Sequence, residues 1–303
     1  MTIKINGARK VAEQAVRKFD LNNSDKQESI DRAVALASDI QREECQLELA
    51  APINDSPLVR IAALAIAQKR AIPIYAPSCP DYTNDGKVYV FGGMGSSISL
   101  LAQYHLRFAE RLLPLFEQNG VNYDYNILSA DIEGLDETLL KLNGISKDEF
   151  DQRIASTIRE TGKVFYSTLK PNATSSANSS GFLDFFDDFT GMQAKVENRI
   201  RQLMQTNESF VYYLNLINSG RYDKLYSVMF GRDEDPEFYM QRTIRTMAQY
   251  AALGHFARQN EAAVITHMTL NSPAYNDHRL SLEPDAESTF KRIAVFNFAR
   301  SVY

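Results

Sequence analysis

The sequence predicts an α/β protein with an open, mainly parallel, Rossmann-like sheet flanked by helices and preceded by a helical N-terminal extension. Two observations predict it. Residues 1–70 carry apolar residues at helical spacing, and from residue 71 onward short β-rich runs alternate with long amphipathic segments. Such alternation is typical of a parallel sheet with right-handed crossover helices. We therefore expect a helical segment, 1–70, packed on a single core formed by an α/β domain, 71–303.

The N-terminal extension is predicted to contain three helices. The first 45 residues show two amphipathic stretches separated by the polar break LNNSDKQ, in which Asn23 or Ser24 can cap the second helix. A third helix, residues 57–70, contains the run IAALAIA. This run is apolar on nearly every side, so it predicts a buried helix.

Strands and helices then alternate. AIPIYAPS and KVYVFGG predict two strands, and a long helix follows them and ends at Gly120. YDYNILSADIEG predicts another strand, and DETLLKLNG begins another helix. Residues 170–180 (KPNATSSANSS) predict a flexible loop, followed by four phenylalanines expected in core or lid packing: Phe182, Phe185, Phe186 and Phe189. Helices at 193–205 and 237–259, a strand in AAVITHMTL and an edge strand in RIAVFNFARSVY complete the expected order.

Composition limits the class of protein. The 303 residues carry a net charge of −5, so no global positive field recruits nucleic acid. No apolar stretch approaches the ~20 residues that cross a bilayer, and the N-terminal residues lack the apolar region of a secretory signal. Two cysteines, Cys45 and Cys79, do not make a disulfide framework. We expect a cytoplasmic protein that does not contact a membrane.

A glycine- and serine-rich turn is the first candidate for a ligand site. In VYVFGGMGSSIS a predicted strand leads to three glycines and two serines at a helix start, namely Gly92, Gly93, Gly95, Ser96 and Ser97. Glycines let backbone N–H groups approach a ligand, and the first turn of a helix offers unpaired donors. This suits a phosphate, a carboxylate or an oxyanion. The alternative is a β–α turn whose serines only cap the helix. The spacing matches neither the dinucleotide-binding nor the Walker A pattern.

Acidic and aromatic side chains follow two predicted strands. Asp131 and Glu133 stand in SADIEG, where an acid could bind a ribose, orient an amine or act as a base. The alternative for both is a solvated loop or a helix cap. Asp81 and Tyr82 stand in PSCPDY, where two prolines stiffen the turn, and could line a pocket. Cys79 in the same turn is expected to be packed and inert.

A late helix and strand could supply cations and a proton carrier. Arg242 and Arg245 share one helical face, with Tyr250 beside it, and two arginines on one face can clamp an anion. His267 ends the strand AAVITH. The alternative pairs the arginines with acids and makes His267 a core group. Histidines and cysteines show no metal-ligand spacing, and we expect neither a metal nor a cofactor.

The order of features in residues 72–150 resembles the isocyanide synthase family, Rossmann-like enzymes that act on an amino acid in natural-product pathways. The matching runs are IPIYAPSCPDYTNDGKVYVFGG, a long helix, NILSAD and LLKLNGISKDEF. The helix QRTIRTMAQYAALGHF and the strand AAVITHM also fall where that family has a basic helix and a histidine-bearing strand. That family usually carries a lysine near the position of Asp81 and Tyr82. The resemblance implies a synthase or transferase of secondary metabolism acting on an amino acid.

A second resemblance is to the cyclodipeptide synthases, which place a nucleophilic serine in a G-x-S turn after a strand. Gly95-Ser96-Ser97 matches that turn, which implies Ser97 as the nucleophile and charged tRNA as a partner. That family's late helix carries Y-x-x-x-E, and here Tyr250 is present with Gly254 in place of the glutamate. Leu100 stands where an asparagine is expected.

Three functions remain open at this point. The first is an enzyme that modifies an amino acid or a related small metabolite, with Asp131 or His267 transferring a proton. The second is a tRNA-dependent acyl transferase that uses Ser97. The third is a non-catalytic binding or effector protein in which the glycine turn is only structural. The sequence leaves the oligomeric state open.

Overall fold

The computed structural model describes residues 2–42, 57–78, 81–82, 89–90, 98–217, 236–266 and 294–295. The helices in these ranges are α1 (Thr2–Val16), α2 (Asn23–Arg42), α3 (Pro57–Ala67), α4 (Leu100–Gln118), the 3-10 helix η2 (Asp131–Leu135), α5 (Glu137–Asn143), α6 (Lys147–Leu169), α7 (Phe182–Phe185), α8 (Phe189–Thr206), α9 (Glu208–Ile217) and α11 (Pro236–Gln259). The strands are β1 (Ile72–Ser78), β2 (Asp81–Tyr82), β3 (Tyr89–Val90), β4 (Tyr123–Ser129), β5 (Ser176–Gly181), β6 (Ala263–Thr266) and β7 (Ala294–Val295).

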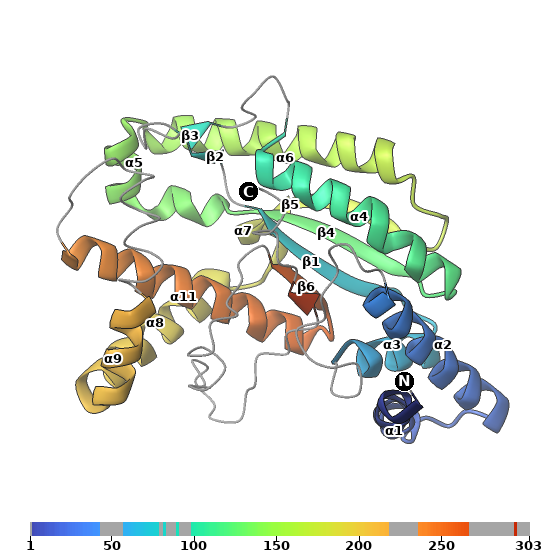
Figure 1. Cartoon of the computed structure of the whole chain (residues 1–303). Helices are drawn as coiled ribbons and strands as arrows, with labels where there is room; N and C mark the ends of the chain where they lie inside the picture. Colours follow the sequence, from blue (N-terminus) through green and yellow to red (C-terminus); the bar gives the residue numbers. More distant parts are fainter. Residues whose placement is uncertain are drawn as a thin grey trace.

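A parallel sheet forms the centre of the molecule (Figure 1). Four strands lie in the order β5-β4-β1-β6, every neighbouring pair is parallel, and the two-residue β7 pairs with β6 in the same sense. In chain order these are the third, second, first, fourth and fifth strands of the sheet. This is the order of doubly wound, Rossmann-like folds. The predicted open, parallel, Rossmann-like sheet is therefore confirmed.

The two central strands are buried on both faces. In each of β1 and β4 every residue is buried except the second, which is half-buried. Near-continuous burial is what a strand covered by helices on both faces requires. The strands pair in register from Ile72↔Tyr123 to Ser78↔Ser129, so they end at the same level of the sheet. Their carboxyl ends therefore form one edge on which a ligand site can be built.

Helices cover both faces of the sheet. In Figure 1, α4 and α6 lie on one side of the strands, and α7, α8 and α11 lie on the other. Alternate residues of β1 divide between the two cores: Ile72 and Ile74 belong to the cluster on the α4 side, and Tyr75 belongs to the cluster on the α11 side. Two helical layers on a parallel sheet place the ligand crevice at an edge of the sheet, because both faces are occupied.

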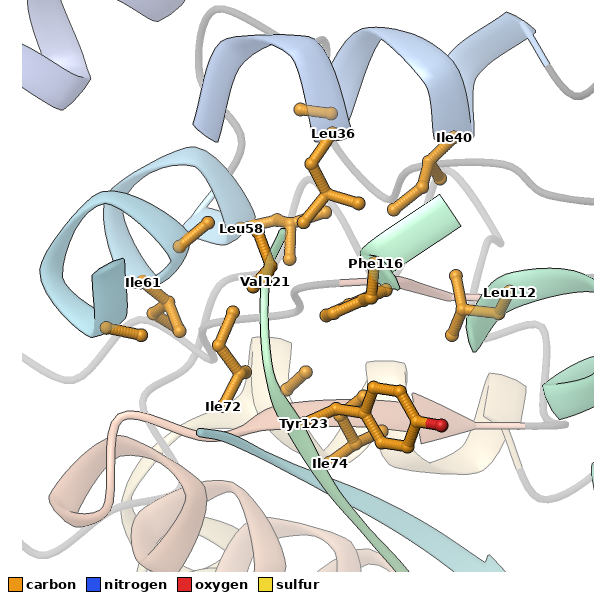
Figure 2. Close-up of a cluster of buried hydrophobic side chains, with 14 of the residues drawn as sticks. Leu36, Ile40, Leu58, Ile61, Ile72, Ile74, Leu112, Phe116, Val121 and Tyr123 are labelled. Atoms are coloured by element: carbon orange, nitrogen blue, oxygen red, sulfur yellow. The ribbon is translucent and has the colours of Figure 1, made fainter. Parts of the chain in front are cut away.

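The N-terminal helices share a core with the sheet. Figure 2 shows Leu36 and Ile40 of α2 packed with Phe116 and the β-strand residues Ile72 and Tyr123. The run IAALAIA in α3 contains residues that are 0% exposed, so the predicted buried helix is confirmed. Burial of each Leu or Ile side chain contributes about 1.5–3 kcal/mol, which makes this cluster a large part of the stability of the fold.

The loop predicted at residues 170–180 is confirmed for residues 170–175, which lie outside helices and strands, and is wrong from residue 176 onward, where β5 forms. Among the described residues β5 is an edge strand, which pairs only with β4. Most of its side chains are half-buried or exposed, so they need no apolar partner. Ser176 and Asn178 instead donate hydrogen bonds to the carboxylate of Asp124 on β4. Backbone pairing and polar contacts across the two strands replace apolar burial here, which explains why a polar sequence forms a strand.

The aromatic cluster after β5 belongs to the core on the α11 face. Phe182, Phe186 and Phe189 are at most 6% exposed, as predicted for core packing, and Phe185 is half-buried. Phe186 stacks on Phe256 of α11 with ring centroids 4.7 Å apart.

None of the helices in the described part of the chain is long and apolar enough to cross a membrane.

Candidate functional site

The candidate site lies at the carboxyl edge of the sheet, where the strand order reverses. From β1 the chain winds outward through β4 and β5, and then returns to place β6 on the other side of β1. Helices that follow strands on opposite sides of such a point leave a crevice between them. The strand ends on the two sides of this point are Ser78 of β1 and Thr266 of β6.

The beginning of α4 is fixed to the end of β1 by two buried serines. Ser99 caps α4, since its hydroxyl accepts a hydrogen bond from the Ala102 backbone N–H at 3.1 Å. The same hydroxyl lies 3.2 Å from the hydroxyl of Ser78, and both serines are at most 4% exposed. The partial positive charge at the start of α4 is therefore held at the carboxyl end of β1.

His105 makes a second connection between α4 and β1. Its side chain is completely buried, and Nε2 lies 2.9 Å from the carbonyl oxygen of Pro77. Burial lowers the pKa of His105 to about 4, although the hydrogen bond to Pro77 favours the proton. The ring is therefore neutral at physiological pH and Nε2 donates to the carbonyl. Sequence reasoning examined this histidine only for metal-ligand spacing and missed its role in fixing α4.

The glycine and serine turn and several other predicted residues lie outside the described residues. They are Gly92, Gly93, Gly95, Ser96, Ser97, His267 and Cys79. Their proposed roles therefore stay predictions. The described segment continues with Ile98 and Ser99, directly at the start of α4.

The strand predicted from KVYVFGG is not part of the parallel sheet. Tyr89–Val90 pairs antiparallel with Asp81–Tyr82 in a separate two-stranded sheet, in the register Asp81↔Val90 and Tyr82↔Tyr89. The run VYVF has high β propensity, but propensity does not distinguish a hairpin from a strand of the main sheet. The sheet strand that precedes α4 is β1, and the hairpin is an insertion between them. Among the described residues, the element that could bind an anion is therefore the start of α4 at the end of β1.

Asp131 lies just beyond the end of β4 and contacts the neighbouring strand β5. Its Oδ1 accepts a hydrogen bond from the Leu183 N–H at 3.2 Å, at the beginning of α7. Gly181 leaves room for it, because a Cβ there would collide with the carboxylate as it is placed. Burial, reinforced by the charge of Asp184, raises the pKa of Asp131 to about 6, even though backbone N–H groups stabilise its charged form. A half-buried carboxyl group with this pKa can accept or donate a proton near neutral pH.

Arg242 and Arg245 contact a carboxylate of the same edge. Both guanidinium groups form ion pairs with Asp136, that of Arg245 at 3.0 Å, and the Asp136 side chain is 7% exposed. Asp136 also caps α5 by accepting from the Leu139 N–H. Although burial opposes its charge, Arg242, the Leu139 N–H and Arg245 together hold the pKa of Asp136 below its usual value. The geometry favours the alternative in which the arginines pair with an acid, and their binding of a substrate stays a prediction.

The remaining predicted residues are divided between this edge and α11. Glu133 is 6% exposed within η2, so it is part of the packed turn after β4. Tyr250 is half-buried on α11, two helical turns beyond Arg242. Among the described residues no group of three His, Cys, Asp or Glu side chains is placed to hold a metal ion. The structure therefore brings Ser78, Ser99 and Asp131 to one edge of the sheet. It also pairs the two arginines with Asp136, a residue that the sequence did not indicate.

Comparison with protein-family models, curated proteins and solved structures found no match for this chain.

Proposed function

We propose that this chain is an enzyme, a transferase or synthase, that modifies an amino acid or a related small metabolite at the carboxyl edge of its sheet. The observation that carries the proposal is the reversal of strand order between β1 and β6, with the start of α4 held at the end of β1. Doubly wound sheets bind their ligands at this position. A helix start there favours the anionic part of a ligand.

Each residue near this edge has a role in the proposal. The N–H groups of the turn Gly92–Ser97 and of the first turn of α4 bind the carboxylate or phosphate of the substrate. Asp131 transfers a proton, which its pKa of about 6 supports. His267 directly follows β6 in the sequence and is the second candidate for proton transfer.

A thermal-shift screen tests the binding step. Amino acids and sugar phosphates are added to the wild-type protein and to Gly95→Val, which places a branched side chain in the turn. A ligand at 100 times its dissociation constant stabilises the protein by roughly 2.7 kcal/mol, so a true ligand raises the melting temperature of the wild type clearly. We expect Gly95→Val to lose this shift. Asp20→Asn, an exposed change between α1 and α2, is the control that keeps it. No shift of the wild type with any compound in either class would refute the proposal.

One experiment separates this proposal from the acyl transferase that uses Ser97. The protein is incubated with aminoacylated tRNA and examined by intact mass. An aminoacyl adduct that Ser97→Ala abolishes would establish the acyl transferase and replace the proposal above. An unmodified mass, together with a ligand-induced thermal shift, supports it.

A further inference from the structure

A cavity lies on the α11 side of the sheet (Figure 1), beside the end of α11. It has a volume of about 360 Å³ and is lined by residues of α7, the turn before α8, and the last turns of α11. Figure 1 shows these three helices on the same side of the sheet. The α11 residues that line it directly precede β6, so the cavity is near the amino end of that strand. Its volume is in the range of small-molecule sites.

Aromatic rings form one wall of this cavity. Phe186 and Phe256 are stacked with centroids 4.7 Å apart, and Phe185 meets Phe186 edge to face at 4.9 Å. Phe185 and Phe256 are half-buried, which leaves part of each ring accessible. Tyr75 of β1 supports Phe185 from below with centroids 5.3 Å apart. The electron-rich faces of such rings attract cations as well as apolar groups.

The polar side of the cavity carries negative charge. Asp187 is exposed, lines the cavity, and has no hydrogen bond or ion pair within the described part of the chain. Its neighbour Asp188 is committed to capping α8, because its carboxylate accepts from the Gly191 N–H at 3.2 Å. His255 is the one basic side chain among the described residues that line the cavity, and no lysine or arginine lines it. Within the described residues Asp187 therefore has no ion-pair partner at the rim.

The end of α11 adds further groups that favour a cation. The carboxyl end of a helix carries a partial negative charge, and α11 ends at Gln259, which lines the cavity. Next to it, Asn260 donates its side-chain N–H to the Tyr75 hydroxyl at 2.9 Å. That bond fixes the amide and leaves its Oδ1 directed away from Tyr75 as an acceptor. The Asp187 carboxylate and the Asn260 amide oxygen complement positive charge. The helix end adds only its partial charge, because the carbonyls of Phe256, Ala257 and Arg258 already accept backbone N–H groups.

We propose that this cavity between α7, α8 and the end of α11 binds a small organic ammonium ion, with the phenylalanine wall holding its apolar part and Asp187 its charge. None of the residues that line this cavity has a role in the reaction proposed at the carboxyl edge, and the proposal does not depend on that reaction.

Calorimetric titration with two pairs of probes tests the proposal. Choline is compared with its neutral isostere 3,3-dimethylbutan-1-ol, and phenethylamine with 2-phenylethanol. We expect saturable binding of at least one of the two cations, about three- to tenfold tighter than that of its neutral counterpart, the range expected for a partly solvated charge pair with an aromatic contribution. Equal affinity for cation and alcohol, or no saturable binding of either cation by the wild-type protein, would overturn the proposal.

Asp187→Asn and a matched control assign the site. Asp187→Asn removes the charge at an exposed position, so the fold is retained, and we expect it to weaken binding of the cation by the same three- to tenfold. Asp184→Asn removes an exposed charge three residues away that does not line the cavity, and we expect the affinity to change less than twofold. If both variants lost affinity equally, the effect would be one of net charge and the assignment to this cavity would fail.

Discussion

The two ends of α11 differ in whether the charged side chains beside them form ion pairs. Toward its beginning, Arg242 and Arg245 form ion pairs with the buried Asp136, which connects α11 to the turn after β4. At its end, α11 borders a cavity at whose rim Asp187 has no such partner in the described residues. The arginines looked like a ligand clamp in the sequence, and the acidic and aromatic stretch looked like packing. Charged residues held in a buried network serve the fold, whereas unneutralised charge beside an accessible cavity is available to a ligand.

Asp136→Ala removes the carboxylate that both arginines bind near the beginning of α11, and it has the largest expected effect. It leaves the 10% exposed Arg242 side chain without its carboxylate and removes the cap of α5. Breaking a buried ion pair on one side costs about 3–5 kcal/mol. We expect a loss of this size in the free energy of unfolding, measured by urea denaturation at pH 7.

The control for that prediction is an exposed ion pair. Asp151 is 48% exposed and binds Lys147, itself 54% exposed, one turn away on α6. Asp151→Ala should cost less than about 1 kcal/mol, because solvent screens exposed pairs. If the two aspartate variants lost similar stability, the Asp136 pair would not hold the edge together.

The elements that could be predicted from the sequence are those that are covered by other elements on both faces. The strands β1 and β4 were predicted because each carries a short β-rich run, and both strands are almost fully buried in the structure. The polar edge strand β5 lacks this pattern and was missed, and the hairpin of β3 was assigned to the main sheet because its local propensity is the same in both settings. Periodicity reports burial and cannot report which strand is the neighbour.

Part of the site could be placed in the same way. Asp131 was placed at the carboxyl edge because it directly follows a strand that could be recognised. The partner of Arg242 could not be predicted, since Asp136 is 106 residues away in sequence and only the crossover of the chain brings them together. The cavity at the end of α11 was missed for the same reason, because its walls come from segments on either side of α8 and α9.

His105→Gln tests whether buried polar groups also stabilise the fold at the end of β1, where His105 contacts the Pro77 carbonyl. The pKa of His105 is lowered from 6.5 to about 4, so the unfolded chain takes up a proton between these pH values while the folded protein does not. The stabilising contribution of the neutral ring is complete above pH 6.5 and is lost as the pH falls toward 4. The shift corresponds to about 3 kcal/mol. We expect His105→Gln to remove this part of the pH dependence, measured as the difference between the variant and the wild type in urea denaturation from pH 4 to 7. An unchanged slope would contradict it.

Asp131→Asn sharpens the comparison, because Asp131 is both hydrogen-bonded and unfavourably charged. Its pKa is raised from 3.8 to about 6, so the folded protein holds the proton more tightly than the unfolded chain. Ionisation therefore destabilises the fold as the pH rises from 3.8 through 6, and the full cost applies above that range. Since the carboxyl group is partly solvated, we expect the neutral amide to add only about 1 kcal/mol to the free energy of unfolding at pH 8, and little at pH 4.

The direction of this change distinguishes two roles of Asp131. If the carboxylate served mainly to hold the beginning of α7 through the Leu183 N–H, the amide would accept that bond less well and the variant would be less stable at pH 8. If burial of its charge dominates, the variant gains stability. The wild-type aspartate then destabilises the fold, and a role in proton transfer would explain why an acid stands at this position. Asp184→Asn is the control, because that carboxylate acts on Asp131 through charge alone and should shift stability in the same direction by a smaller amount.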